Sequence, residues 1–263
     1  MNLRQVRKKI KSVTNVKKIT KAMQLVSAVK MKKAQTIAVE GRPYRSKLEE
    51  LFFRILPSID PKQSPLLSST TESKRELVVL ISSNKGLAGA FNMNLFKLFI
   101  KNTDFKNTDF ITLGKKGTVF VSIMGGNVLA DFSSATPSSD VAAVFEMVIE
   151  KFLNKEYAKV YLSYNTFIST LRNEAVKEQL LPFELTHDEK KKEIAGDAED
   201  TELEYLIEPD RTKLFEQLLI NYLEEKIRGA VQNSEASEHS ARMIAMKNAT
   251  DNATDVIYSF TLL

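Results

Sequence analysis

Residues 1–39 read MNLRQVRKKIKSVTNVKKITKAMQLVSAVKMKKAQTIAV, and this segment indicates the architecture of the chain. It contains eleven Lys or Arg but no Asp or Glu, and it has no Gly or Pro to interrupt a helix. The chain as a whole carries 38 basic and 33 acidic residues, so its net charge of +5 divides into +11 on this segment and −6 elsewhere. Charge separated in this way predicts one long cationic helix with an acidic partner along it.

The other end of the chain, residues 209–263, also has the pattern of a continuous helix, with Gly229 its one glycine. Leucines recur there at helical spacing, and alanines continue the stripe toward the end of the chain. Two long helices at opposite ends predict an antiparallel coiled coil closed by the residues between them. We therefore divide the chain into an N-terminal coiled-coil helix (1–56), a Pro- and Ser-rich linker (57–75), an α/β domain (76–208) and a C-terminal coiled-coil helix (209–263).

The segment between the helices alternates strand and helix patterns, which predicts a small, largely parallel sheet. Residues 187–204 are rich in Asp and Glu and read as an exposed loop. We expect strands at 77–82, 109–113 and 159–164, further strands at 119–123 and 180–185, and helices ending near Ile100 and spanning 138–154.

The apolar pattern of the first helix changes partway along it. Leu3, Val6, Ile10 and Val13 keep coiled-coil spacing, but the same seam continues through mostly polar or small residues. A second apolar row starts there, rotated around the helix axis: Val16, Ile19, Met23 and Val26. Two interpretations stay open: the coiled coil changes register, or the second row faces a surrounding protein. Near the other end the repeat NATD, at 248–251 and 252–255, stacks polar residues in rows that can set the register of a packing seam.

Composition excludes several classes of protein. With no Cys the chain has no disulfide and no thiolate chemistry, which fits a reducing compartment. No apolar run approaches the roughly 20 residues that span a bilayer. His187 lies in a charged loop and His239 has no partner at ligand spacing, so we expect no metal site, no cofactor and no catalytic residues.

Two other functions compete with the acidic-partner interpretation. A Lys-rich coiled coil can bind nucleic acid phosphates, although the first helix has no aromatic residue for base stacking. The loop 82–89 (SSNKGLAG) follows a strand and opens a helix, as phosphate-binding loops do in nucleotide-binding α/β enzymes. It lacks the spacing of the established phosphate-loop motifs, so we read it as a tight turn.

Four segments resemble the γ subunit of F-type ATP synthases: RKKIKSVTNVKKITKAMQLVSAVKMKKAQ (7–35), ISSNKGLAGAFN (81–92), YLIEPD (205–210) and SEHSARMIAMKNATDNATD (237–255). They occur in the family's order and span nearly the whole chain. The resemblance implies a shaft of two terminal helices inside the hexamer of α and β subunits, with a Rossmann-like α/β domain between them. It implies a foot beside the ε subunit on the membrane c ring, and rotation that couples proton flow to ATP synthesis or hydrolysis.

The resemblance also implies roles for particular residues and a location. Such a subunit would be non-catalytic and peripheral, at the cytoplasmic face of the bacterial plasma membrane, with no membrane span and no nucleic acid partner. Family members usually continue past the segment that ends here at Leu263. Either the chain is a fragment or its shaft is short, and of the two we expect a fragment. Contacts with the α/β hexamer are implied for Lys8, Lys11, Lys18, Ile19, Lys21, Met23, Val26, Arg242, Lys247 and Asp251. Contacts near the c ring and ε are implied for Tyr205, Glu208 and Asp210.

Overall fold

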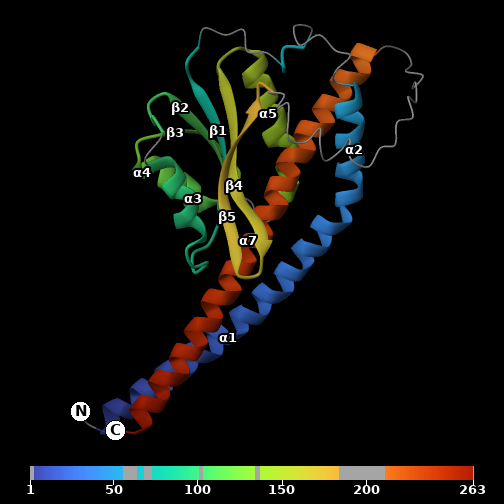
Figure 1. Ribbon diagram of the computed structural model, residues 1–263. Helices are drawn as coiled ribbons and strands as arrows, with labels where there is room; N and C mark the ends of the chain where they lie inside the picture. Colours follow the sequence, from blue (N-terminus) through green and yellow to red (C-terminus); the bar gives the residue numbers. More distant parts are fainter. Residues whose placement is uncertain are drawn as a thin grey trace.

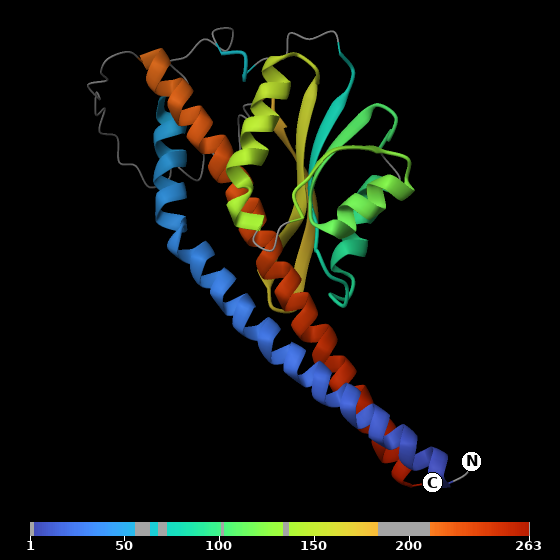
Figure 2. The same ribbon diagram turned by 180° about the vertical axis from the view of Figure 1, so that it is seen from behind.

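Two long helices run side by side and extend well beyond the rest of the molecule (Figures 1 and 2). The computed structural model describes residues 3–55, 64–67, 73–100, 103–133, 137–183 and 211–262. Helix α1 spans Leu3–Glu40 and helix α7 spans Arg211–Thr261. The two ends of the chain lie together at the tip of the pair, so the helices are antiparallel. The predicted coiled coil of terminal helices is confirmed.

The first seam of α1 continues along the whole coiled coil. Val6, Thr20, Ser27 and Ala34 are its buried residues, and they keep an exact seven-residue repeat from Thr20 to Ala34. A strict seven-residue repeat keeps one face of a helix against its partner. The interpretation in which the coiled coil changes register is therefore wrong. Leu3, which we had placed in the seam, is 63% exposed.

The N-terminal coiled-coil segment is two helices rather than one. Helix α2 spans Arg42–Ile55, and Gly41 forms a turn between it and α1. Pro43 has no backbone N–H, so it removes one hydrogen bond from the helical ladder at this point. Arg45 bridges the break, because its guanidinium donates to the Ala38 carbonyl at 2.6 Å and to the Gln232 side chain of α7 at 3.1 Å. The chain thus changes direction here while staying attached to α7 (Figure 2).

The α/β domain is built on a five-stranded sheet with the order β3-β2-β1-β4-β5. Strands β1 to β4 are parallel to their neighbours, and β5 runs antiparallel to β4. The predicted strands at 77–82, 109–113 and 159–164 are present. The strands are β1 (Glu76–Ile81), β2 (Thr108–Leu113), β3 (Asn127–Asp131), β4 (Lys159–Ser169) and β5 (Arg172–Leu181). The domain's helices are α3 (Phe91–Ile100), α4 (Lys115–Ile123) and α5 (Val141–Leu153), with a 3-10 turn at Pro137–Ser139.

Two of the strand predictions were wrong. Residues 119–123 lie in helix α4, although Val119 and its β-branched neighbours favour a strand. The helix forms because it buries Gly117 and Val121, and packing overrides intrinsic preference. The predicted strand at 180–185 overlaps β5 only at Leu180 and Leu181. Both outer strands lack the fully buried run of a central strand: β3 alternates between exposed and half-buried residues, and β5 is buried only at its last two residues.

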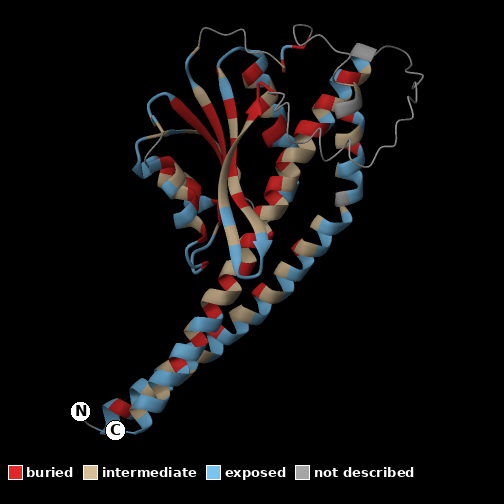
Figure 3. Cartoon of the chain, viewed as in Figure 1, coloured by how far each residue is buried: buried red, intermediate tan, exposed pale blue. Residues whose placement is uncertain are grey.

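The hydrophobic core occupies both faces of the sheet. On one face α3 and α4 cover β1 and β2. On the other, α2, α5 and the first half of α7 share a larger core with the strands. Phe52 of α2 stacks on Tyr222 of α7 at 4.8 Å between ring centroids and is fully buried. Helix α2 and the first half of α7 therefore belong to the core of the domain. Buried residues become sparse only along the free part of the coiled coil (Figure 3).

Among the helices in the described ranges, none combines the length and apolar character needed to cross a membrane. Most of the linker 57–75 and all of the acid-rich segment 187–204 lie outside the described residues. Tyr205, Glu208 and Asp210 lie outside them as well.

Candidate partner interface on the coiled coil

The lysines expected to meet a partner project from α1 into solvent. Lys8, Lys11, Lys18 and Lys21 are all exposed. Within the part of the chain that the structure describes, Lys8, Lys11 and Lys18 have no ion-pair partner, and the Lys21 ammonium donates only to the Gln24 side chain, at 3.3 Å. The coiled coil therefore presents positive charges that its own carboxylates do not neutralise.

The second apolar row of α1 lies outside the seam. Val16, Ile19 and Val26 are 49%, 60% and 57% exposed, and Met23 is half-buried. Val29, farther along the helix, is 72% exposed. Apolar side chains gathered on one exposed helix face are typical of a surface that binds another protein. Of the two interpretations of this row, the structure supports the one in which it faces outward.

The three predicted contact residues of α7 do not share one environment. Lys247 and Asp251 are exposed, near the level of Met23 and Thr20 on the partner helix. Arg242 is only 9% exposed and is bound within the chain. Its Nη2 atom donates to the carbonyl of Lys85 at 3.0 Å, and its Nη1 atom pairs with Glu238 at 2.5 Å. The structure thus places Arg242 between the coil and the α/β domain, a role that sequence spacing does not reveal.

Polar groups of the loop 82–89 are hydrogen-bonded to other residues of the same chain. The loop leads into α3, and it also contacts the first turn of α4, where the N–H groups have no helical partner. Those N–H groups already have acceptors in the protein. Lys116 N–H donates to the Ser83 carbonyl at 3.1 Å, and Gly117 N–H donates to the Ser82 hydroxyl at 2.8 Å. Lys115 N–H donates to the Asn84 side chain at 3.1 Å. The loop therefore uses its own polar groups to cap α4.

Helix α7 crosses the crevice where related sheets bind nucleotides. In open α/β sheets that crevice lies at the carboxyl ends of the strands, where the strand order reverses, here between β1 and β4. Ser237 and Ser240 donate to the carbonyls of Asn165 and Thr170, at 3.2 Å and 2.5 Å. Arg242 holds the loop that follows β1, one turn farther along α7. The helix thus joins both sides of the crevice through these hydrogen bonds.

Three titratable groups lie on α7 within the two turns before Arg242. Burial raises the pKa of Glu235 and of Glu238, while Arg242 acts against that rise at Glu238. Burial also lowers the pKa of His239 to about 4, and the positive charges of Arg242 and Lys30 add to this effect. His239 is therefore neutral at pH 7. Within the described residues no group of His, Asp and Glu is arranged to hold a metal ion.

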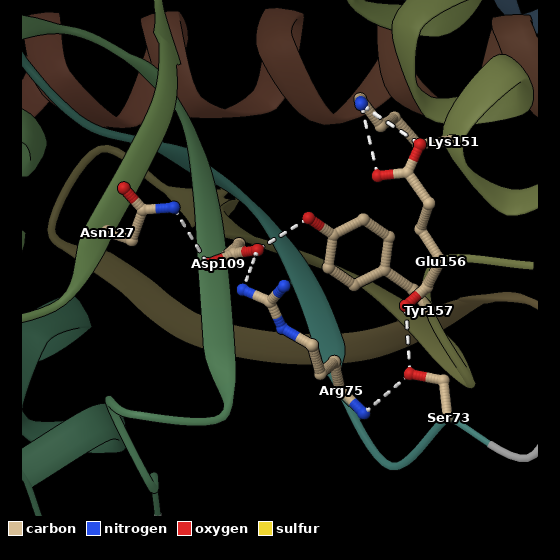
Figure 4. Close-up of polar contacts among 7 residues, drawn as sticks. All are labelled: Ser73, Arg75, Asp109, Asn127, Lys151, Glu156 and Tyr157. Atoms are coloured by element: carbon tan, nitrogen blue, oxygen red, sulfur yellow. Dashed lines mark hydrogen bonds and ion pairs between the residues drawn. The ribbon is translucent and has the colours of Figure 1, made fainter.

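A second polar cluster lies at the opposite, amino-terminal edge of the sheet (Figure 4). Asp109 is 1% exposed and accepts hydrogen bonds from Arg75 at 2.6 Å, Tyr157 at 2.5 Å and Asn127 at 3.0 Å. Ser73 donates to the Glu156 carbonyl at 2.8 Å, beside the same group. The carboxylate thus ties together β2, β3, the start of β1 and the turn before β4. Its oxygens are satisfied by the chain itself, which indicates a structural role.

Comparison with known proteins places the chain in one family. The family model described as ATP synthase (ATP-synt) matches residues 2–263. The chain is 36% identical over 266 residues to the ATP synthase gamma chain of Akkermansia muciniphila, covering 99% of this chain and 91% of that one. It is also 36% identical over 273 residues to the gamma chain of Geobacter sp. strain M21, covering 100% and 91%.

Solved structures show the same fold at lower sequence identity. The rotor of the Euglena gracilis mitochondrial ATP synthase matches with a TM-score of 0.65 and 19% identity, over 98% of this chain and 94% of that one. The central stalk of the Tetrahymena thermophila mitochondrial enzyme matches with a TM-score of 0.60 and 24% identity, over 88% and 99%.

A coiled coil of terminal helices around an inserted Rossmann-like domain defines the class of rotor-shaft proteins. The chain belongs to the ATP synthase gamma-chain family. Its role is that of a non-catalytic shaft subunit in an F-type complex, peripheral to the membrane. These matches confirm the resemblance to the γ subunit that the sequence suggested. They favour it over the nucleic-acid-binding and nucleotide-enzyme alternatives.

Proposed function

We propose that this chain is the central shaft that turns inside a hexamer of α and β subunits and couples rotation of a membrane c ring to ATP synthesis or hydrolysis. The observation that carries the proposal is the outer surface of the free coiled coil, where Lys8, Lys11, Lys18 and Lys21, which make no ion pair within the described residues, lie among exposed apolar side chains. The partners are the α and β subunits around the coil, with the ε subunit and the c ring at the other end. The complex lies at the cytoplasmic face of the bacterial plasma membrane.

The chemistry of this surface suits a shaft that turns. Nine of the eleven basic residues in the segment 1–39 are Lys, which act as hydrated point charges rather than as bidentate locks. Exposed Lys–carboxylate pairs contribute at most about 1 kcal/mol each. Contacts of this kind hold the shaft near acidic loops without favouring one rotation angle strongly.

The contact set comes from both helices. On α1 it comprises the four lysines named above with Ile19, Met23 and Val26, and on α7 it comprises Lys247 and Asp251. Arg242 acts differently, because its donors are already bound inside the chain. For Tyr205, Glu208 and Asp210 the proposal of contacts near the c ring and ε rests on the sequence resemblance alone.

A substitution on the apolar row tests the proposal. Met23→Lys puts a new cation on the half-buried edge of the row, where it can pair with an acidic loop of the hexamer. A partly desolvated pair is stronger than an exposed one and would create a preferred rotation angle. We expect the isolated chain to lose less than about 1 kcal/mol of stability. In the reconstituted complex, proton pumping per ATP hydrolysed should fall.

The matched control is Ile123→Lys. Ile123 is 76% exposed at the end of α4, on the α/β domain and away from the coil, so this variant should pump normally. If Met23→Lys assembles into a complex that pumps normally, the proposed contact is refuted. A large loss of thermal stability in the isolated chain would instead show that Met23 belongs to the packing of the coil.

A further inference from the structure

One side chain links the free coiled coil to the carboxyl edge of the sheet. Arg242 lies on α7 where that helix leaves the domain, and it is 9% exposed. Its Nη2 atom donates to the carbonyls of Lys85 at 3.0 Å and Gly86 at 3.3 Å, and its Nε atom to Gly86 at 3.4 Å. The Nη1 atom pairs with Glu238 one turn earlier on α7. One guanidinium therefore binds a carboxylate on the helix and two carbonyls on the loop.

The loop that Arg242 holds is itself rigid. Asn92 at the start of α3 accepts from the Ser83 N–H at 3.1 Å and donates to the Ser83 hydroxyl at 2.7 Å. The same hydroxyl donates to the Lys85 carbonyl at 2.8 Å. The Ser83 carbonyl caps α4 in turn. The loop is thus hydrogen-bonded to both α3 and α4 of the domain.

The loop also packs directly on α7. Gly89 has a φ of +56°, and a Cβ built on it would lie 3.9 Å from both the Ala241 carbonyl oxygen and the Ala245 Cβ. The left-handed conformation at Gly89 turns the loop toward the helix, and the small side chains of α7 allow the approach. The serine contacts of α7 with β4 hold the other side of the crevice. Together these contacts surround the point where the domain joins the coil.

We propose that Arg242 is a positioning residue that makes the α/β domain and the coiled coil one rigid body, so that torque passes between them without slip. This inference rests on the proposed shaft function, since rigidity matters only if the chain transmits rotation. We call Arg242 with the carbonyls of Lys85 and Gly86 the Arg242 clamp. A buried guanidinium that makes several charge-assisted hydrogen bonds fixes the orientation of the loop relative to the helix as well as the distance between them. A single ammonium lacks this fork of donors.

The first test measures rigidity in the isolated full chain. Arg242→Lys keeps the charge beside Glu238 but removes the fork to the loop, whereas Glu238→Gln keeps the fork and removes the ion pair. The chain has no Cys, so spin labels at Val119→Cys and Asp255→Cys report the distance from domain to coil. Both positions are exposed. We expect Arg242→Lys to broaden the distance distribution and Glu238→Gln to leave it narrow.

A second pair of spin labels, both within the coiled coil, distinguishes movement of the domain relative to the coil from fraying of the two helices. Labels at Lys18→Cys and Asp255→Cys both lie on the free coil and should keep the same distribution in all variants. If Arg242→Lys leaves the distribution from domain to coil as narrow as in the parent chain, the proposal is refuted. Equal broadening of both pairs refutes it too, because the residue would then only stabilise the coil.

The second test restores the link in another way. Gly89→Cys with Ala245→Cys places two Cβ atoms at a separation within the range of a disulfide. In a complex carrying Arg242→Lys, pumping per ATP hydrolysed should be low while the two cysteines are reduced, and it should recover when they are oxidised. Comparing one sample in two redox states cancels the strain of a non-glycine residue at position 89. Pumping that stays low after the disulfide forms would overturn the proposal.

The two proposals fail in different ways. If the parent chain cannot support a rotating, pumping complex, the shaft function fails while the distance measurement still tests the clamp. If the parent complex pumps and Arg242→Lys pumps equally well, the clamp fails and the shaft function stands.

Discussion

The hydroxyls of Thr20 and Thr250 lie 2.8 Å apart across the seam of the coiled coil. Each also lies within hydrogen-bonding distance of a carbonyl of its own helix, that of Lys17 at 3.1 Å and that of Met246 at 2.8 Å. Two hydroxyls have two protons for these three contacts, so one threonine donates to its backbone and the other donates across the seam. This polar pair joins α1 and α7 at a position where most coiled coils have an apolar residue.

The first prediction concerns this pair. Thr20→Val or Thr250→Val alone should lower stability by about 1 kcal/mol, because each leaves a buried hydroxyl with fewer partners. The double variant should lose less than the sum of the single variants, because an apolar pair of the same shape replaces both groups. Urea unfolding followed by helical circular dichroism gives the four free energies. Strictly additive losses would contradict a direct bond between the two threonines.

The second prediction concerns the buried carboxylate in Figure 4. Asp109→Asn should cost about 3 kcal/mol, because the variant removes a buried charge that three donors bind. Tyr157→Phe, which removes one donor, should cost about 1 kcal/mol. Burial and the bond to Asp109 raise the pKa of Tyr157, so this donor keeps its proton at neutral pH.

The matched control for that series is Lys151→Ala. Lys151 pairs with Glu156 at 3.0 Å near the same cluster, but both side chains are about one-third exposed, at 32% and 39%. We expect a loss below about 0.5 kcal/mol. Chemical unfolding of the four chains supplies the comparison, and an Asp109→Asn loss as small as the control would exclude a structural role for the cluster.

The third prediction is a pH dependence of stability. The folded-state pKa of His239 is about 4, below the ordinary value of 6.5, so the unfolded chain binds more protons between those values. The contribution of His239 is fully present above pH 6.5 and is lost as the pH falls toward 4. The neighbouring Glu235 and Glu238 have raised pKa values and act in the opposite direction.

A variant isolates the histidine from those carboxylates. His239→Gln removes the titration and keeps a polar side chain of similar size. The stability difference between the parent chain and the variant should therefore change between pH 7 and pH 5, in the direction of relative loss for the parent at pH 5. Unfolding free energies at both pH values measure it. Parallel pH profiles for the two chains would show that His239 titrates normally.

The fourth prediction is weak nucleotide binding. The N–H groups at the start of α4 donate to the loop 82–89, and α7 is hydrogen-bonded to both sides of the crevice between β1 and β4. We expect the isolated chain to bind ATP or NAD no more tightly than about 1 mM, which is roughly −4 kcal/mol. Calorimetric titration measures this directly. A micromolar dissociation constant would revive the nucleotide-enzyme interpretation.

Local sequence patterns determined much of this protein. The long helices at both ends, the charge of the first 39 residues and the strands at 77–82, 109–113 and 159–164 all follow from periodicity and composition. These features depend on neighbours in the chain, and so they can be predicted without a structure. The outward apolar row containing Ile19 and Val26 was visible too, although the sequence left open which way it faced.

Tertiary structure alone decided the rest. Val119 lies in a helix because Gly117 and Val121 pack on the sheet. Strand β5 pairs with β4 although apolar and polar residues alternate only weakly along it. Arg242 binds carbonyls 156 and 157 residues away in the chain, and Thr20 meets a hydroxyl 230 residues away. Sequence spacing carries no information on such contacts, because a hydrogen bond depends on where the fold brings two groups and not on their separation along the chain.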